Sequence, residues 1–196
     1  MRPLLLVCAL ALVLGGCDAG GSPGASSTTT TTSTVAPQPV ADGCPLFHGT
    51  SSIAASDGAR PVGLLTGATA GAEGCLDVVT FTFQSLGNGT PPGYVVAYKD
   101  PPFSDGDPPR EISLDGGAFL SVTISPASSV DITKEDAPRT YTGNLLLRYG
   151  DHHHLVEVRK FDDVLGTVNW VIGLDAKRPF LVDSAANPTR ISVYIG

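Results

Sequence analysis

Alternation of apolar and polar residues is the feature that most restricts how this chain can fold. The clearest case is 167–174, where four large apolar side chains share one face: Val168, Trp170, Ile172 and Leu174. A period of two in segments rich in β-branched and aromatic residues is typical of strands with one buried face. The same pattern recurs at 76–83, 94–98, 119–125, 155–161 and 190–195. We therefore expect Trp170 in the core, and no segment has the periodicity of an amphipathic helix.

Glycine and proline separate these segments. Residues 87–93 form one turn cluster, and the prolines of 100–109 exclude a central strand or a helix there. Short strands with such turns predict an all-β fold, namely an antiparallel β-sandwich of about seven to nine short strands with few or no helices.

The N-terminus has a different character. Arg2 precedes an apolar run over 4–13, and this run leads to Leu-Gly-Gly-Cys at 14–17. That arrangement is typical of a secretory signal, and the run is shorter than the roughly 20 residues of a membrane-spanning helix. Its end resembles the lipobox of bacterial lipoproteins. The resemblance implies a signal peptide over 1–16 and a lipid such as palmitate on Cys17, whereas the alternative is an ordinary secretory signal.

Residues 17–43 are expected to be a disordered linker behind the lipidated cysteine. They are rich in Gly, Ser, Thr and Pro, and no apolar residue recurs at a structural period. A flexible linker of about 25 residues reaches ~25–30 Å. The expected location is the outer face of the bacterial cytoplasmic membrane, with a lipid anchor and with the domain near the wall.

Cysteine usage predicts one disulfide. Four cysteines are present, and two remain once Cys8 leaves with the signal and Cys17 takes the lipid. An even remainder in an exported protein indicates a Cys44–Cys75 bridge, although two free buried thiols are the alternative. Because residues 44–75 carry few apolar clusters, we expect them to form an irregular N-terminal extension before a domain over 76–196.

The chain offers little for catalysis. It carries 12 basic and 19 acidic residues, a net charge of −7, which disfavours nucleic acid as a partner. Outside the linker over 17–43, G-x-S-x-G, P-loop and H-E-x-x-H motifs are absent, so no enzyme, metal or cofactor is predicted. His152-His153-His154 is interpreted as a solvated hairpin tip, with weak metal binding as the alternative. The pair Asp162-Asp163 is interpreted as a solvated turn.

Several segments together resemble the actinobacterial AMIN-like domain. The resemblance rests on 76–83, 92–98, 117–122, 161–174, 178–180 and 187–190. It implies a β-sandwich over 76–196 in a secreted or lipid-anchored protein. The related AMIN domain targets periplasmic enzymes to the cell wall. One departure is Val78, where family members often have Arg.

Two functions follow from these features. The first is binding of a wall component, peptidoglycan or wall polysaccharide, without catalysis. The alternative is an assembly lipoprotein that docks another envelope protein. Exposed aromatic rings beside polar groups suit sugars, so Tyr94, Tyr98 and Arg148 are candidate binding residues. Ordinary strand packing is the alternative for all three.

Overall fold

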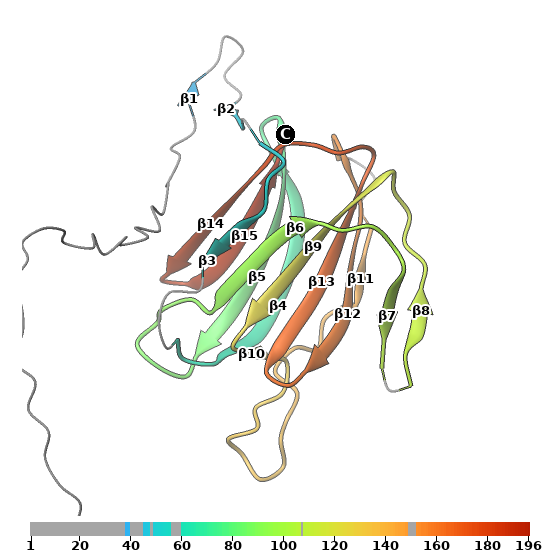
Figure 1. The fold of residues 1–196 in the computed structure, drawn as a ribbon. Coiled ribbons are helices and arrows are strands. Elements are labelled where there is room, and N and C mark those ends of the chain that lie inside the picture. Colours follow the sequence, from blue (N-terminus) through green and yellow to red (C-terminus); the bar gives the residue numbers. More distant parts are fainter. Residues whose placement is uncertain (1–37, 40–44, 48, 56–59, 107, 149–151) are drawn as a thin grey trace, which may run out of the picture. The chain divides into compact units, whose positions relative to one another are not determined.

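The structure is a computed structural model and describes residues 38–39, 45–47, 49–55, 60–106, 108–148 and 152–196. The chain separates into two units, 1–35 and 36–196, and all described residues belong to the second. All regular secondary-structure elements among the described residues are β-strands (Figure 1). The described part contains no helix long and apolar enough to cross a membrane.

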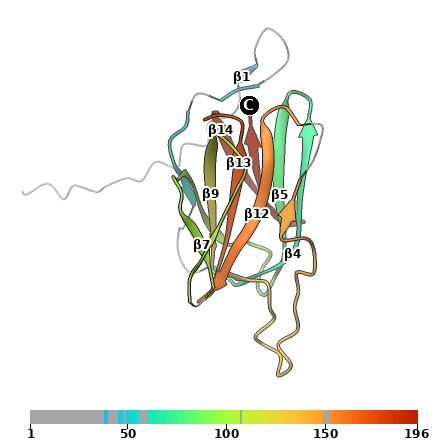
Figure 2. The same ribbon diagram turned by 90° about the vertical axis from the view of Figure 1, so that its right-hand side faces the viewer.

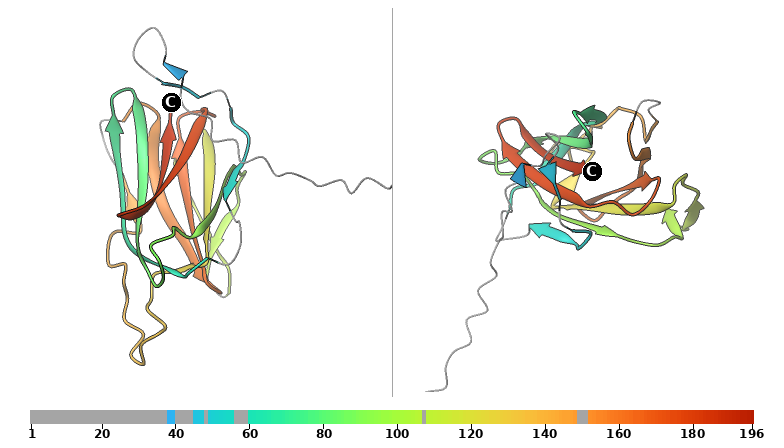
Figure 3. Two further views of the ribbon diagram at one scale, coloured as in Figure 1. Left: turned by 90° about the vertical axis from the view of Figure 1, so that its left-hand side faces the viewer. Right: turned by 90° about the horizontal axis from the view of Figure 1, so that it is seen from above.

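Two sheets pack face to face, as Figures 2 and 3 show from the side and from above. One has the order β10 (Ala127–Ser128), β4 (Gly63–Glu73), β5 (Leu76–Ser85), β15 (Thr189–Ile195) and β14 (Phe180–Ala186). The other has the order β11 (Leu146–Leu147), β12 (Leu155–Val164), β13 (Thr167–Leu174), β9 (Ala118–Ser125), β6 (Gly93–Tyr98) and β3 (Ile53–Ala55). Two small pairs are separate, β7 (Phe103–Asp105) with β8 (Arg110–Ile112) and β1 (Gln38–Pro39) with β2 (Pro45–Leu46). Pairing is antiparallel except between β10 and β4, so the predicted antiparallel sandwich is confirmed.

The core lies between the two sheets. The four apolar residues predicted to share a face of β13 are all fully buried, as expected for the inner face of a strand. Trp170 lies at the centre, with its ring centroid 5.2 Å from that of Phe81 on the opposite sheet and 5.7 Å from that of Tyr141. The opposite face of β13 is buried over a short stretch. There Val171 packs with Phe103 and Ile112 beneath the β7–β8 pair.

Within the segment expected to be an irregular extension, residues 63–73 form a regular strand. β4 is an 11-residue strand that pairs with β5 along its length. Its side chains are mostly Gly, Ala and Thr, and Ala68 and Ala70 pack against the core. These small residues pack against the opposite sheet but give no strong alternation of apolar and polar residues. For this reason the sequence did not predict the strand.

The sandwich has two distinct ends. The upper end, as seen in Figure 1, carries the 74–75 turn and the connections at 99–102, 113–117, 152–154 and 175–179. The lower end carries the connections at 86–92 and 187–188, the β12–β13 turn at 165–166 and the long connection between β10 and β11.

Candidate binding groove

A groove of about 360 Å³ opens at the upper end of the six-stranded sheet. It is lined by the end of β6, the start of β9 and the connection after β13, with these residues: Tyr98, Lys99, Asp100, Pro101, Gly117, Ala118, Phe119 and Lys177. A second hollow of about 170 Å³ shares Pro101 and Phe119 with it and is lined further by β7–β8 residues such as Phe103 and Ile112. The volume of the first groove lies within the range of small-molecule sites.

Strand pairing and close backbone approach shape the groove. The amide of Lys99 donates a hydrogen bond of 3.0 Å to the carbonyl oxygen of Phe119, which continues the β6–β9 ladder to the rim. The amide of Gly117 donates to the carbonyl oxygen of Leu174 over 2.7 Å. A Cβ on Gly117 would lie only 2.3 Å from the carbonyl oxygen of Asp175, so this approach requires glycine. The connection that carries Lys177 is thereby held against the start of β9.

Two lysines lie against aromatic rings at the groove. The Nζ of Lys177 is 4.9 Å from the ring centroid of Tyr98, and the Nζ of Lys99 is 5.7 Å from that of Phe103. Such cation–π contacts are worth about 0.5–1 kcal/mol at exposed sites. Among the described residues, neither lysine forms an ion pair with a carboxylate. The groove therefore combines apolar ring surface with two ammonium groups, and the exposed Asp100 adds one acceptor.

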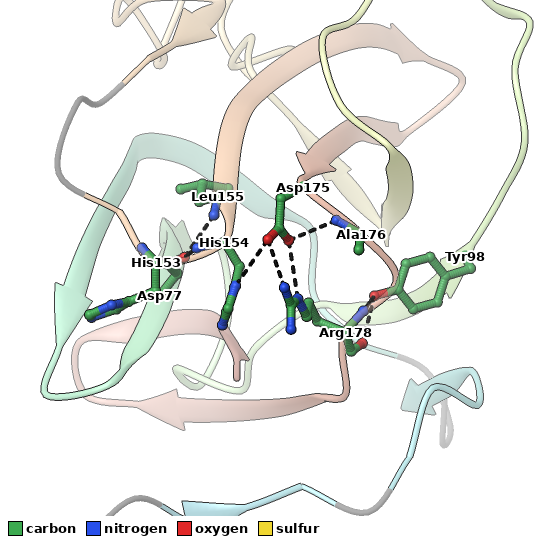
Figure 4. A network of polar contacts seen from close by, with 8 residues as sticks. All are labelled: Asp77, Tyr98, His153, His154, Leu155, Asp175, Ala176 and Arg178. Carbon is green, nitrogen blue, oxygen red and sulfur yellow. Dashed lines mark hydrogen bonds and ion pairs between the residues drawn. The ribbon is translucent and has the colours of Figure 1, made fainter.

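A polar network fixes the wall that carries Lys177 (Figure 4). The hydroxyl of Tyr98 donates to the carbonyl oxygen of Arg178 over 2.6 Å and accepts from the Arg178 amide over 2.8 Å. The Arg178 guanidinium forms two hydrogen bonds with Asp175, one of 3.1 Å from Nε and one of 2.7 Å from Nη2. Burial raises the pKa of Tyr98, and the hydrogen bonds from Arg178 hold the pKa of Asp175 well below its ordinary value.

The network continues to a buried carboxylate, Asp77 at the start of β5. Its Oδ2 accepts from the amides of His154 over 2.6 Å and Leu155 over 2.7 Å, and its Oδ1 accepts from the His153 amide over 3.0 Å. The Nδ1 of His152 lies 3.2 Å from Oδ1. Burial by itself would raise the pKa of Asp77, but these hydrogen bonds together lower it. The Nδ1 of His154 lies 3.3 Å from Asp175 Oδ2, which links Asp77 to the groove wall.

The three predicted binding residues lie in three different environments. Tyr98 lines the groove. Tyr94 is only 8% exposed and belongs to the main core, which corresponds to the strand-packing alternative. Arg148 donates to the buried Glu157 through Nε and Nη2, over 3.1 and 3.0 Å, and through Nη2 to Asp115 over 2.9 Å. The groove residues Lys99, Lys177 and Phe119 were missed, and the only signal in the sequence was their position beside predicted turns.

Two polar motifs differ in part from their interpretation as solvated turns, although His153 is exposed as expected. The side chain of His152 is only 5% exposed, because it lies against Asp77 at the start of β5. Asp163 accepts hydrogen bonds from the Ser129 hydroxyl and, over 2.9 Å, from Lys160. Within the described residues, no group of three or more His, Cys, Asp or Glu side chains is arranged to hold a metal ion.

The predicted modifications fall mostly outside the described residues. Cys17 and Cys44 are not among them, so the lipid and the Cys44–Cys75 bridge stay predictions. Cys75 itself is partly buried in the turn between β4 and β5, at the upper end of the sandwich.

Comparison with known proteins gives a family. The family model of the AMIN-like domain matches residues 63–196, which is more than half of the chain. The chain therefore belongs to the AMIN-like domain family, and the match includes β4, which the expected domain start at residue 76 left out. No curated protein and no solved structure matches the chain. Membership of this family points to a cell-wall-related role.

Proposed function

We propose that this chain is a lipid-anchored envelope protein whose AMIN-like domain binds a wall glycan in the upper groove without turning it over. The observation that carries the proposal is the groove itself, where Lys177 lies against the ring of Tyr98 and Lys99 lines the same rim. Sugars present apolar C–H faces and hydroxyl groups, so they are recognised by aromatic rings with a few polar partners. Cys17 and the linker behind it would keep this groove close to the wall.

Sedimentation with purified peptidoglycan tests the proposal. The full-length chain in mild detergent should pellet with the wall material at physiological salt. Ala118→Trp places a large side chain in the groove and should leave the protein in the supernatant. Ala54→Trp is the matched control, because Ala54 is exposed on β3 and does not line the groove. Equal pelleting of all three proteins would show that the groove is not the site.

The same incubation tests the absence of catalysis. A binding protein leaves the wall material insoluble, whereas an enzyme releases soluble fragments over time. Chromatography of the supernatant should therefore show no fragment above the level of a buffer control. Released fragments that disappear with Ala118→Trp would make the groove an active site and would contradict the non-catalytic part of the proposal.

A second candidate function is docking of another envelope protein. It is favoured by large apolar side chains exposed at the lower end, where Leu165 is 98% and Ile132 is 72% exposed. Exposed apolar groups of this kind occur at protein contacts. If this function holds, Leu165→Asn with Ile132→Ser abolishes capture of one stoichiometric envelope partner, and Ala118→Trp leaves that capture unchanged.

A further inference from the structure

Two lysines of this acidic chain form ion pairs with carboxylates, and within the described residues the other two do not. The sequence contains four lysines against 19 acidic residues. Lys134 forms an ion pair of 3.2 Å with Asp131, and Lys160 forms one of 2.9 Å with Asp163. Lys99 and Lys177 both line the groove, and within the described part of the chain neither is paired with a carboxylate. The unpaired ammonium groups thus gather at one place on a chain that has carboxylates in excess.

We propose that the groove selects glycan units that bear a carboxylate, with Lys99 and Lys177 as the residues that bind it. This inference rests on the proposed function and names the chemistry of its ligand. Contact with the rings of Phe103 and Tyr98 holds the two cations without neutralising them. A carboxylate that displaces water there gains charge-assisted hydrogen bonds, which are stronger than neutral ones.

The other groups of the groove fit the rest of such a ligand. The ring of Tyr98 offers apolar surface to the sugar, and the carboxylate of Asp100 can accept from a hydroxyl or amide group. Phosphate is the alternative anion, because ammonium groups bind it as well as carboxylate, and a glycerol phosphate oligomer distinguishes the two.

A matched pair of soluble disaccharides tests the inference by calorimetry on the full-length chain in detergent. N-acetylglucosaminyl-N-acetylmuramic acid carries a lactyl carboxylate, and diacetylchitobiose has the same backbone type without it. We expect at least tenfold tighter binding of the acidic disaccharide, with an affinity that falls as salt is added. Lys99→Gln with Lys177→Gln should abolish this preference, whereas Lys99→Arg with Lys177→Arg should keep most of it. Lys134→Gln, which removes one lysine charge at the lower end, is the control for charge loss away from the groove and should have no effect.

The outcomes separate this inference from the proposed function. Equal affinity for both disaccharides, with no effect of the glutamine variant, would overturn the selectivity and leave glycan binding in place. Lysine-dependent binding of a glycerol phosphate oligomer in preference to the acidic disaccharide would also overturn it, in favour of phosphate. Binding to peptidoglycan but to neither disaccharide would show that the lactyl carboxylate is not what the groove recognises. Failure to bind the disaccharides and whole peptidoglycan would remove the proposed function as well. Thermal unfolding of each variant shows that a lost affinity is not a lost fold.

Discussion

The upper and lower ends of the sandwich are built from different kinds of residue. At the upper end, Asp77 and Asp175 accept hydrogen bonds that order the connections beside the groove, and Asp77 is fully buried. At the lower end, large apolar side chains stand in water, among them Val164 at 52% and Leu165 at 98% exposure. Buried, hydrogen-bonded carboxylates fix loop geometry, and a binding site needs such fixed geometry. The lower end also has hydrogen-bonded carboxylates, Asp131 and Asp163, but the groove lies at the upper end, on the same side as the fully buried Asp77.

Asp77→Asn, at the upper end, should lower the stability of the protein most. Asp77 accepts hydrogen bonds on both oxygens, whereas an asparagine presents one oxygen and an NH₂ group that faces other donors. The loss of buried charge-assisted bonds is expected to lower the free energy of unfolding by about 3 kcal/mol. Urea denaturation measures this change, and a loss below about 1 kcal/mol would contradict the role of Asp77 as the central acceptor.

The pH dependence of stability provides a second measurement on the same residue. The pKa of Asp77 is lowered in the folded protein from its ordinary 3.8. Its contribution to stability is therefore complete above about pH 4 and is lost as the pH falls through the folded pKa. The difference in unfolding free energy between the wild type and Asp77→Asn should shrink over that acidic window. A difference that stays constant from pH 6 to pH 2 would contradict the lowered pKa.

The sequence predicted the framework of the molecule better than it predicted this upper end. Alternation identifies β13 and the burial of Trp170, because the inner face of a strand leaves a local pattern. The contacts of Asp77 with residues 152–155 join positions more than 70 residues apart, and no local pattern encodes them. The groove is also formed by segments that are distant in the sequence, so Lys99 and Lys177 line the same groove only in the folded chain.

Arg148→Ala tests which of the upper-end polar groups are structural. Arg148 hydrogen-bonds to Glu157, whose side chain is 1% exposed, and its loss leaves that carboxylate with the amide of Asp115. We expect the free energy of unfolding to fall by about 1–2 kcal/mol, as for a hydrogen bond to a charged group. Affinity for peptidoglycan should stay unchanged, because Arg148 does not line the groove. A stable variant that has lost its affinity for peptidoglycan would instead indicate that Arg148 belongs to the binding site.

Arg178→Ala should have the opposite profile, with a small effect on stability and a clear one on binding. The ion pair with Asp175 is partly exposed, at 35% and 42% of the two side chains, so its loss should change the free energy of unfolding little. The wall that carries Lys177 would lose its guanidinium clamp, and affinity for the acidic disaccharide should fall severalfold. Arg159→Ala is a suitable control, since Arg159 donates to the Ser113 carbonyl oxygen outside this wall. Unchanged affinity in Arg178→Ala would show that the backbone contacts with Tyr98 position Lys177 without help.

Leu165→Asn tests the lower end and should produce the smallest change, in the direction of greater stability. Leu165 and Gly166 form the two-residue β12–β13 turn with φ values of 54° and 74°. Turns with two positive φ values favour Asn-Gly, because asparagine tolerates the left-handed region better than leucine does. Since the leucine side chain is 98% exposed, its removal sacrifices almost no burial. The free energy of unfolding should therefore rise by about 0.5 kcal/mol, with peptidoglycan affinity unchanged. A destabilised variant would mean that Leu165 makes a contact that its exposure does not reveal, and the contrast between the two ends would then be smaller than their side chains indicate.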